Sequence, residues 1–188
     1  MLFDLDGTLW RGHEWYALVL YEVCGVDRAA TRGRLAAGAN VFQLAEEAGL
    51  SRLRTINACG ERVESLEMYD GVVAGLQGLS ERGRKLGIVT SLSPAIAGPA
   101  LESLGLDQFF GVKAFAARKP HPGALLAALG ELGEEAHARH YYVGDSVKDA
   151  ECAARAGVAF AWASYGYGAM ARVANVVLLE KFADVVDL

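Results

Sequence analysis

Short apolar runs alternate with longer stretches of helical spacing from Leu86 to the end of the chain. We expect strands at 86–90, 112–117, 140–144, 158–163 and 175–179, and one more in the opening residues MLFD. The segments between these runs place apolar residues three and four apart, as an amphipathic helix does. Strands that alternate with helices of this length predict βαβ units, and therefore an α/β fold with a parallel sheet flanked by helices.

Residues 13–65 follow a different pattern, because their apolar residues keep helical spacing throughout and no strand pattern interrupts them. Residues typical of helix N-caps precede three of the expected helices. They are Asp27, Asn40 and Ser51. We predict a small all-helical cap over residues 13–65, inserted after the first strand into a core made of residues 1–12 and 66–188.

One residue conflicts with this assignment. Pro99 stands in the middle of the helical segment 91–106. Proline lacks an N–H group and its ring clashes with the preceding helical turn. The helix is therefore expected either to kink at Pro99 or to begin late.

Composition narrows the classes of function. A net charge of −5 and an isoelectric point near 5.4 argue against a nucleic-acid partner, which favours basic proteins. No apolar stretch approaches the ~20 residues that a membrane span needs. Cys24, Cys59 and Cys152 form no CxxC pair, and no basic leader precedes Asp4. We expect a soluble cytoplasmic protein, monomeric or homodimeric, with neither a nucleic-acid nor a membrane partner.

The opening segment MLFDLDGTLW places Asp4 and Asp6 two residues apart at the end of an apolar run. Alternate residues of a strand share one face, so the two carboxylates are expected to converge. Two like charges at such range repel each other unless a cation lies nearby. The rest of the chain must supply that cation if the pair has a function.

Polar residues also stand at the ends of three later strands. Thr90 and Ser91 end the second strand, Lys119 follows the third, and Asp145 and Asp149 follow the fourth. Parallel sheets gather ligands at the carboxyl ends of their strands. Several acids with one lysine and one hydroxyl suggest a hard cation bound by oxygens, most simply Mg²⁺.

A chemistry follows from this group of residues. A carboxylate can attack phosphorus and form an aspartyl-phosphate. The approach of two anions needs a metal ion, an ammonium group and fixed donors on the phosphoryl oxygens. A second acid must protonate the leaving oxygen and then activate a water.

The motifs DLDGT, VTS, KPHP around Lys119 and GDSVKD resemble those of the haloacid dehalogenase (HAD) superfamily in order and spacing. The resemblance is closest to its phosphoglycolate-phosphatase-like branch, which has a helical cap after the first motif. It covers nearly the whole chain and implies a Rossmann-like core. It also implies a Mg²⁺-dependent phosphatase that hydrolyses a small phosphate monoester.

The resemblance implies a role for each matching residue. Asp4 is expected to be the nucleophile and Asp6 the general acid and base. Thr90 and Ser91 are expected to bind the phosphoryl group, and Lys119 to bridge that group and the nucleophile. Because dehalogenases of the superfamily lack an acid at the position of Asp6, the resemblance points to phosphoryl transfer.

The same resemblance implies a metal site. Asp145 is expected to ligate Mg²⁺ directly, beside Asp4 and the backbone carbonyl of Asp6. Asp149 is expected near the metal. Taken alone, Asp145 could be a helix N-cap, or a cap and a ligand at once, and Asp149 could be a charge that complements a helix N-terminus.

Other functions remain open at this point. A sugar phosphomutase of the same superfamily would use the same motifs, and a non-catalytic regulatory protein that binds phosphoesters would keep the fold. A phosphonatase needs a cap lysine, and residues 11–65 contain none. A calcium loop does not fit, because the glycine of DLDG comes too early after the first acid and no glutamate follows at the required distance.

The sequence of the expected cap does not identify the leaving group of the substrate. Between residues 11 and 65, seven arginines balance seven acids, so no net field selects a doubly anionic substrate. Arg11, Arg52 and Arg54 are candidates to hold a second carboxylate or phosphate. His13 either faces the substrate or is a surface residue. The segment WRGHEW also lacks the acidic-serine pair common in this branch.

Overall fold

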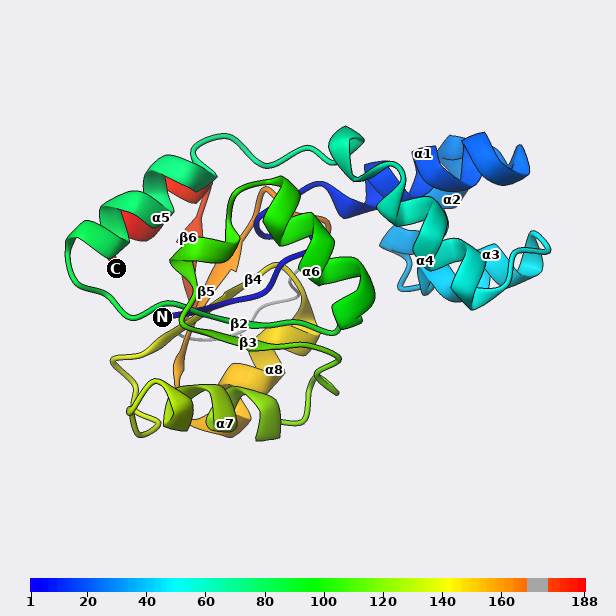
Figure 1. The fold of residues 1–188 in the computed structure, drawn as a ribbon. Helices are drawn as coiled ribbons and strands as arrows, with labels where there is room; N and C mark the ends of the chain where they lie inside the picture. The colour runs from blue at the N-terminus through cyan, green and yellow to red at the C-terminus, as the bar shows by residue number, and fades with distance from the viewer. Residues whose placement is uncertain (169–175) are drawn as a thin grey trace.

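The computed structural model describes residues 1–168 and 176–188. A six-stranded parallel sheet in the order β3-β2-β1-β4-β5-β6 runs through its centre (Figure 1). The strands are β1 Leu2–Phe3, β2 Gly87–Val89, β3 Val112–Ala114, β4 Tyr141–Gly144, β5 Ala159–Ala163 and β6 Val176–Leu179. The predicted α/β class with a parallel sheet is confirmed; Asn175, expected to begin the last strand, lies outside the described residues.

Helices cover both faces of the sheet, and the two residues of β1 show why. Leu2 and Phe3 point to opposite faces and each is almost wholly buried. Phe3 packs in the cluster that holds α5 and α6, and Leu2 in the cluster that holds α7 and α8. The core helices are α5 Val72–Glu81, α6 Pro94–Ser103, α7 Gly123–Glu131 and α8 Val147–Ala156.

Helix α6 answers the question raised by its internal proline. The helix begins at Pro94, whose missing N–H costs nothing in the first turn, but this start is not late enough to place Pro99 in the first turn as well. Pro99 lies inside it. The helix therefore tolerates the loss of one internal hydrogen bond while its buried face packs on the core.

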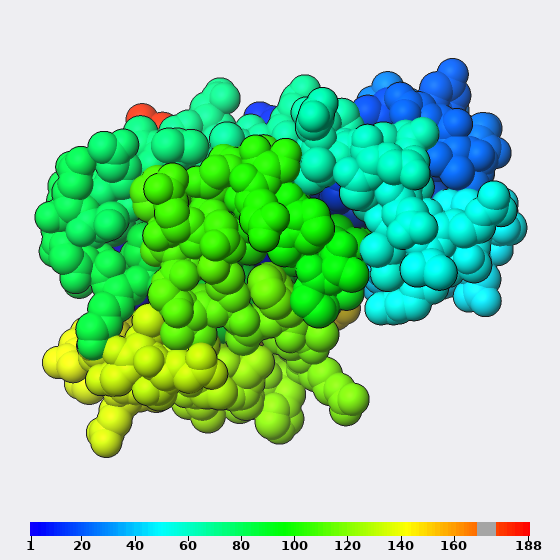
Figure 2. Space-filling view, viewed as in Figure 1, coloured from blue at the N-terminus to red at the C-terminus, as the bar shows by residue number. Residues whose placement is uncertain are grey.

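Four helices and a short 3₁₀ turn fill the segment between β1 and α5. They are α1 Gly12–Cys24, α2 Arg28–Ala36, α3 Val41–Glu47, α4 Arg52–Gly60 and the turn Val63–Ser65. The expected N-caps are confirmed, since Asp27, Asn40 and Ser51 accept the N–H groups of Ala30, Phe42 and Arg54 respectively. In the space-filling view these helices form a lobe beside the green region that contains α6 (Figure 2).

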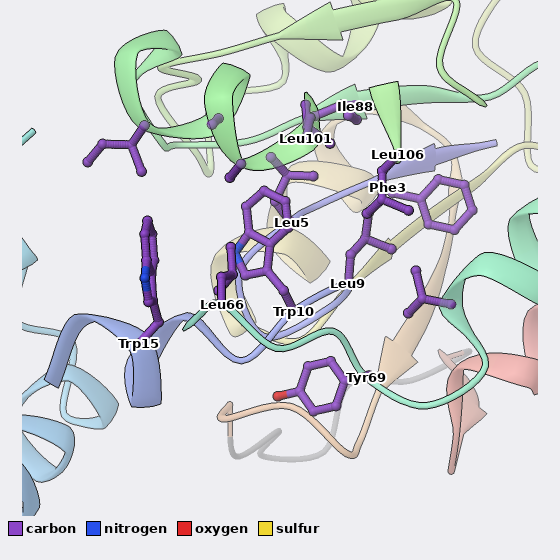
Figure 3. Close-up of a cluster of buried hydrophobic side chains, with 14 of the residues drawn as sticks. Phe3, Leu5, Leu9, Trp10, Trp15, Leu66, Tyr69, Ile88, Leu101 and Leu106 are labelled. Atoms are coloured by element: carbon purple, nitrogen blue, oxygen red, sulfur yellow. The ribbon is translucent and has the colours of Figure 1, made fainter. Parts of the chain in front are cut away.

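Two hydrogen-bonded segments join this lobe to the core. The Arg11 N–H donates to the Glu67 carbonyl at 2.8 Å, and the Tyr69 N–H donates to the Leu9 carbonyl at 3.0 Å. Trp10 lies between them and is fully buried, in the same cluster as Leu9 and Tyr69 (Figure 3). The two connecting segments are therefore paired by backbone hydrogen bonds around a buried apolar side chain, directly after the first strand.

Candidate active site

The carboxyl ends of the central strands open into a cavity of about 360 Å³. Its core wall comes from the residues that follow β1, β2, β3 and β4. Among them are Asp4, Asp6, Thr90, Ser91, Lys119 and Asp145. Six of the seven predicted site residues thus line one cavity, because parallel strands bring their carboxyl ends to the same edge.

Lys119 lies at the centre of this wall with its side chain only 4 % exposed. Its Nζ lies 2.9 Å from Asp4 Oδ1 and 2.6 Å from Asp149 Oδ1. It also donates to the Tyr142 hydroxyl at 3.2 Å. Burial opposes the charged form, but the two carboxylates outweigh it and raise the pKa of Lys119. The lysine is therefore a fixed ammonium group that holds Asp4 in place.

Asp149, the seventh predicted residue, is wholly buried beneath the cavity wall. Its Oδ1 accepts from Tyr142 at 3.0 Å, and its Oδ2 accepts from the Ser146 N–H at 3.0 Å and the Ser146 hydroxyl at 2.5 Å. Ser146, and not Asp145, is the N-cap of α8, so that alternative for Asp145 is wrong. The capping box leaves Asp145 outside the helix, one residue before its cap.

Asp145 is oriented by the loop that follows β5. Its Oδ2 accepts from the Tyr167 N–H at 2.9 Å and the Gly168 N–H at 3.2 Å. Only glycine fits at two neighbouring positions, since a Cβ on Gly7 or Gly166 would lie within 2.4 Å of the Asp145 side chain. Within the described chain, Oδ1 accepts no hydrogen bond, which leaves that oxygen for another partner.

Asp4, Asp145 and Asp149 form a group in which one oxygen from each lies within 4.8 Å of the others. All three are buried. Burial first, and then the neighbouring acids, raise the pKa of Asp4 to about 6 and that of Asp145 to about 7. Such mutual repulsion is what a bound cation relieves, and three carboxylate oxygens are ligands for a hard metal ion. The cluster therefore fits a metal ion.

Asp6 lines the cavity but lies outside that three-carboxylate group. Its carboxylate packs against the start of α1, where a Cβ on Gly12 would lie 1.9 Å from Asp6 Oδ1. Burial, together with the charges of Asp145 and Asp4, raises the pKa of Asp6 well above its ordinary value. A raised pKa favours the protonated form of this carboxyl group, which is the form that acts as a general acid.

Thr90 and Ser91 occupy the turn after β2. The Thr90 N–H donates to the Ala114 carbonyl at 3.0 Å, and its hydroxyl accepts from the Leu92 N–H at 3.3 Å. The Ser91 hydroxyl donates to the Ala117 carbonyl at 2.9 Å. Thr90 is buried whereas Ser91 is exposed, so the two hydroxyls meet the cavity from different depths.

The wall opposite the core comes from the helical lobe. It consists of His13, Leu35, Ala36, Gly38 and Ala39. Burial lowers the pKa of His13 to about 4, so its imidazole is neutral at pH 7. Arg11 instead packs over the Tyr69 ring at 4.5 Å, and Arg52 over the Phe42 ring at 4.0 Å. None of Arg11, Arg52 and Arg54 lines the cavity.

Sequence reasoning missed three kinds of contact at this site. Tyr142 is an interior strand residue whose hydroxyl joins Lys119 and Asp149, and nothing in the pattern YYV marks it. Ser146 stands inside GDSVKD but was not singled out. Tyr167 acts through its backbone, and the GYG segment carried only a family resemblance. The glycines of that segment were the signal for a close backbone approach.

The chain is an α/β enzyme of the hydrolase class, with a parallel sheet and with buried acids and a lysine at the carboxyl edge of that sheet. The chain belongs to the haloacid dehalogenase-like hydrolase family, whose sequence model matches residues 1–157. No helix in the described part of the chain is long and apolar enough to cross a membrane.

Relatives of known name support the phosphatase branch of that family. The chain is 30% identical over 216 aligned residues to the phosphoglycolate phosphatase of Rhodospirillum rubrum, covering all of this chain and 89% of that protein. It is 28% identical to the phosphoglycolate phosphatase of Pectobacterium atrosepticum, covering all of this chain and 91% of the relative.

Solved structures share the fold over almost the whole chain. A HAD-superfamily hydrolase of subfamily IA from Geobacter sulfurreducens superposes with a TM-score of 0.75 at 25% identity, covering 99% of this chain and 93% of the other. A phosphoglycolate phosphatase assigned by prediction in Haemophilus somnus superposes with a TM-score of 0.82 at 23% identity, covering 99% and 95%. The second likeness concerns the fold alone.

Proposed function

We propose that this protein is a Mg²⁺-dependent phosphatase that hydrolyses a small phosphate monoester through an aspartyl-phosphate on Asp4. The observation that carries the proposal is the position of Asp4. Its carboxylate lies 2.9 Å from the Lys119 ammonium and belongs to the same oxygen cluster as Asp145 and Asp149. A nucleophilic carboxylate that must meet an anionic phosphoryl group needs cationic partners of this kind.

In the first half of the reaction, an Asp4 carboxylate oxygen attacks phosphorus and forms the acyl phosphate. The bond between phosphorus and the ester oxygen breaks, and the carboxyl proton of Asp6 passes to the departing alkoxide. The raised pKa of Asp6 supports this role, because it favours the protonated form that donates to the alkoxide. Thr90, Ser91 and Lys119 hold the phosphoryl oxygens during the transfer.

In the second half, a water molecule attacks the phosphorus of the acyl phosphate. Asp6, now a carboxylate, takes the proton from that water. The bond between phosphorus and the Asp4 oxygen breaks, which returns Asp4 as a carboxylate and releases inorganic phosphate. Asp6 thereby regains the proton that it gave to the alcohol, so the cycle balances.

Asp4 and Asp145, with the Asp6 backbone carbonyl, would hold the metal ion, and Asp149 would support it. A bound Mg²⁺ would neutralise charge on the phosphoryl oxygens during both displacements. Mg²⁺ is favoured over softer metals because every proposed ligand is an oxygen. The Lys119 ammonium already neutralises part of the acidic cluster, which favours one divalent ion over two.

The substrate is proposed to be small because the helical lobe, residues 13–65, stands over the cavity as a cap. Leu35, Ala36 and Ala39 supply an apolar wall there, which bounds a cavity of about 360 Å³. The curated relatives are named phosphoglycolate phosphatases, so 2-phosphoglycolate is the first substrate to test. A closed cap would also exclude bulk water from the acyl phosphate.

The test is release of phosphate from p-nitrophenyl phosphate, 2-phosphoglycolate and a panel of small phosphate esters. Each is measured with Mg²⁺, with EDTA, and with the Asp4→Asn variant. Turnover that needs both Mg²⁺ and Asp4 is the expected result. In parallel, sugar phosphates are assayed for isomerisation, because a phosphomutase with the same residues would move the phosphoryl group rather than release it.

Two results would overturn the proposal. Isomerisation of a sugar phosphate without net phosphate release would assign the chain to a mutase. Absence of turnover on the whole panel, from a folded protein that binds Mg²⁺, would favour a binding role. The Asp6→Asn variant distinguishes the binding role from catalysis further, since a protein that only binds phosphoesters does not need the proton on Asp6.

A further inference from the structure

The hydroxyl of Tyr167 reaches from the core to the beginning of the cap. It accepts a hydrogen bond from the His13 N–H at 3.1 Å and donates to the Glu14 carboxylate. A phenol can do both at once, because it carries one donor and free lone pairs. His13 and Glu14 are in the first turn of α1, which is the first helix of the cap.

That first turn has no cap of its own. Arg11 is the N-cap residue of α1 and makes no side-chain capping bond. The leading N–H groups of a helix have no partner within the helix, and a side-chain oxygen normally accepts one of them. Tyr167 supplies that oxygen from a distant part of the chain. The cap's first helix is thus capped by a residue of the core.

The ring of Tyr167 makes a second contact with the same helix. It stacks on the His13 imidazole with ring centroids 3.7 Å apart and planes 15° apart. Both residues line the cavity. The stacking therefore fixes the position of His13 in the cavity wall.

The backbone of Tyr167 points the other way, toward the acidic cluster. Its N–H donates to Asp145 Oδ2 at 2.9 Å. Gly168, the next residue, allows this approach because a Cβ there would lie 2.1 Å from the Asp145 carbonyl oxygen. One residue therefore contacts a proposed metal carboxylate through its amide and the cap through its side chain.

We propose that Tyr167 is a positioning residue that holds the cap in its closed orientation over the acidic cluster. Its hydroxyl caps α1 and binds Glu14 only when the cap lies against the core. Opening the cap breaks both hydrogen bonds and leaves the first turn of α1 without a partner for the His13 N–H. The hydroxyl therefore favours the closed state, in which a substrate is enclosed.

The first experiment compares Tyr167→Phe with a matched control, Tyr165→Phe. In Tyr167→Phe the new phenyl ring can still stack on His13 and the backbone amide still reaches Asp145, so only the hydroxyl contacts are lost. Tyr165 lies in the same loop, and its hydroxyl donates to the Thr8 carbonyl at 3.0 Å, within the core. Native-state amide exchange at His13 is the readout, and it requires no activity.

We expect the His13 amide to exchange about ten-fold faster in Tyr167→Phe, the size of effect that the loss of a helix cap produces. Tyr165→Phe should leave that amide unchanged. Titration with Mg²⁺ should give dissociation constants within about two-fold of each other for both variants and the parent, because the amide contact with Asp145 remains. Equal exchange at His13 in the two variants would overturn the inference, as would a changed Mg²⁺ affinity with unchanged exchange.

The kinetic test rests on the proposed phosphatase activity. For Tyr167→Phe we expect KM to rise about three- to ten-fold with kcat within about two-fold, since closure is weakened but the chemistry is intact. Glu14→Ala should raise KM similarly. The double variant should raise KM little further, because both substitutions remove the same Tyr167–Glu14 hydrogen bond. Fully additive increases in KM would show that Tyr167 and Glu14 do not act through one shared hydrogen bond, and would contradict the inference. If the parent protein has no turnover, the proposed function fails, and amide exchange alone decides the role of Tyr167.

Discussion

The two walls of the cavity are built in opposite ways. On the core wall, Asp4 and Lys119 are buried, and ion pairs of 2.9 and 2.6 Å join Lys119 to Asp4 and to Asp149 beneath the wall. On the cap wall, the lining residues other than His13 offer the cavity only apolar or backbone atoms. The core wall fixes charge, whereas the cap wall fixes shape.

Catalysis and substrate selection are expected to depend on different walls of the cavity. A buried ion network has one good arrangement, because removing either partner leaves an uncompensated charge. An apolar wall tolerates exchange of one hydrophobic residue for another of similar volume at a small cost. The chemistry is therefore expected to depend on single core residues, and the substrate range on the summed shape of the cap.

The largest expected effect is on the core wall, at the proposed nucleophile. Asp4→Asn keeps the size of the side chain but removes the charge that attacks phosphorus. We expect hydrolysis of the best substrate to fall by about 10⁴-fold or more, as removal of a nucleophile does in other hydrolases. Rapid quenching followed by mass measurement should find one added phosphoryl group on the parent enzyme and none on the variant.

A cap-wall change of similar size provides the comparison. Ala39→Ser adds one oxygen to the apolar wall and is expected to change KM by a few-fold at most, with kcat unchanged. If Asp4→Asn kept more than about a tenth of the activity, the aspartyl-phosphate route would be wrong, and the contrast between the two walls would lose its basis.

The second effect concerns Lys119. Lys119→Met keeps the length of the side chain but leaves Asp4 and Asp149 without their ammonium partner, which is expected to cost about 3–5 kcal/mol of unfolding free energy. Activity should fall by about 10²–10³-fold as well, because the phosphoryl oxygens lose a fixed charge. Denaturant titration and steady-state rates measure the two losses.

Lys148→Met is the matched control, since Lys148 lines the same cavity but is exposed. Its ammonium group remains in solvent, where a charge contributes about 0–1 kcal/mol at most. Equal losses of stability from the two substitutions would contradict the view that the buried ion pairs hold the core wall together.

The third effect is the response of the acidic cluster to pH and metal. Asp4 and Asp145 have pKa values of about 6 and about 7 in the metal-free protein, both above their ordinary value of 3.8. The folded state therefore holds protons that the unfolded chain has released. The stability contributed by these two groups is full below about pH 4 and is lost as the pH rises through 6 and 7.

Binding of Mg²⁺ should restore the stability that is lost as the pH rises. Excess Mg²⁺ at about one hundred times its dissociation constant is expected to add about 2.7 kcal/mol at pH 8, where the carboxylates are ionised. Unfolding curves with EDTA and with Mg²⁺, taken between pH 4 and pH 8, measure both effects. Asp145→Asn should flatten the pH dependence and weaken the Mg²⁺ effect; an unaltered profile would exclude Asp145 from the cluster's titration.

The sequence could predict the features that depend on local chemistry or on the topology of a parallel sheet. Asp145 and Lys119 stand in short motifs next to recognisable strands, so the topology alone predicted that they would meet. The caps Asp27 and Ser51 were equally readable, because an N-cap acts within a few residues of its own position. These predictions rest on local chemistry or on the geometry common to all parallel sheets.

Contacts between distant segments could not be predicted from the sequence. Tyr142 reaches Lys119 from the interior of a strand, and Tyr167 reaches Glu14 across 153 residues of sequence. Nothing in their neighbours specifies those pairings, which follow from packing.

The smallest effect compares two helix caps. Ser146→Ala removes the N-cap of α8, and Asp27→Ala removes the N-cap of α2, whose side chain accepts the Ala30 N–H at 2.7 Å. The lost capping bond is expected to cost about 1 kcal/mol of unfolding free energy in each variant, because each removes one capping oxygen. Denaturant titration measures this shared cost.

The functional costs of the two variants should differ although the costs of the lost capping bonds agree. Ser146 also donates its hydroxyl to Asp149 at 2.5 Å, so Ser146→Ala loosens a carboxylate of the acidic cluster. We expect Mg²⁺ affinity to fall about ten-fold or more, as it does when a residue that orients a metal ligand is lost. Asp27→Ala should leave Mg²⁺ affinity unchanged, because α2 reaches the cavity only through apolar residues at its other end. Equal Mg²⁺ affinities in the two variants would mean that Asp149 needs no support from its own helix cap, and that Lys119 and Tyr142 alone hold it in place.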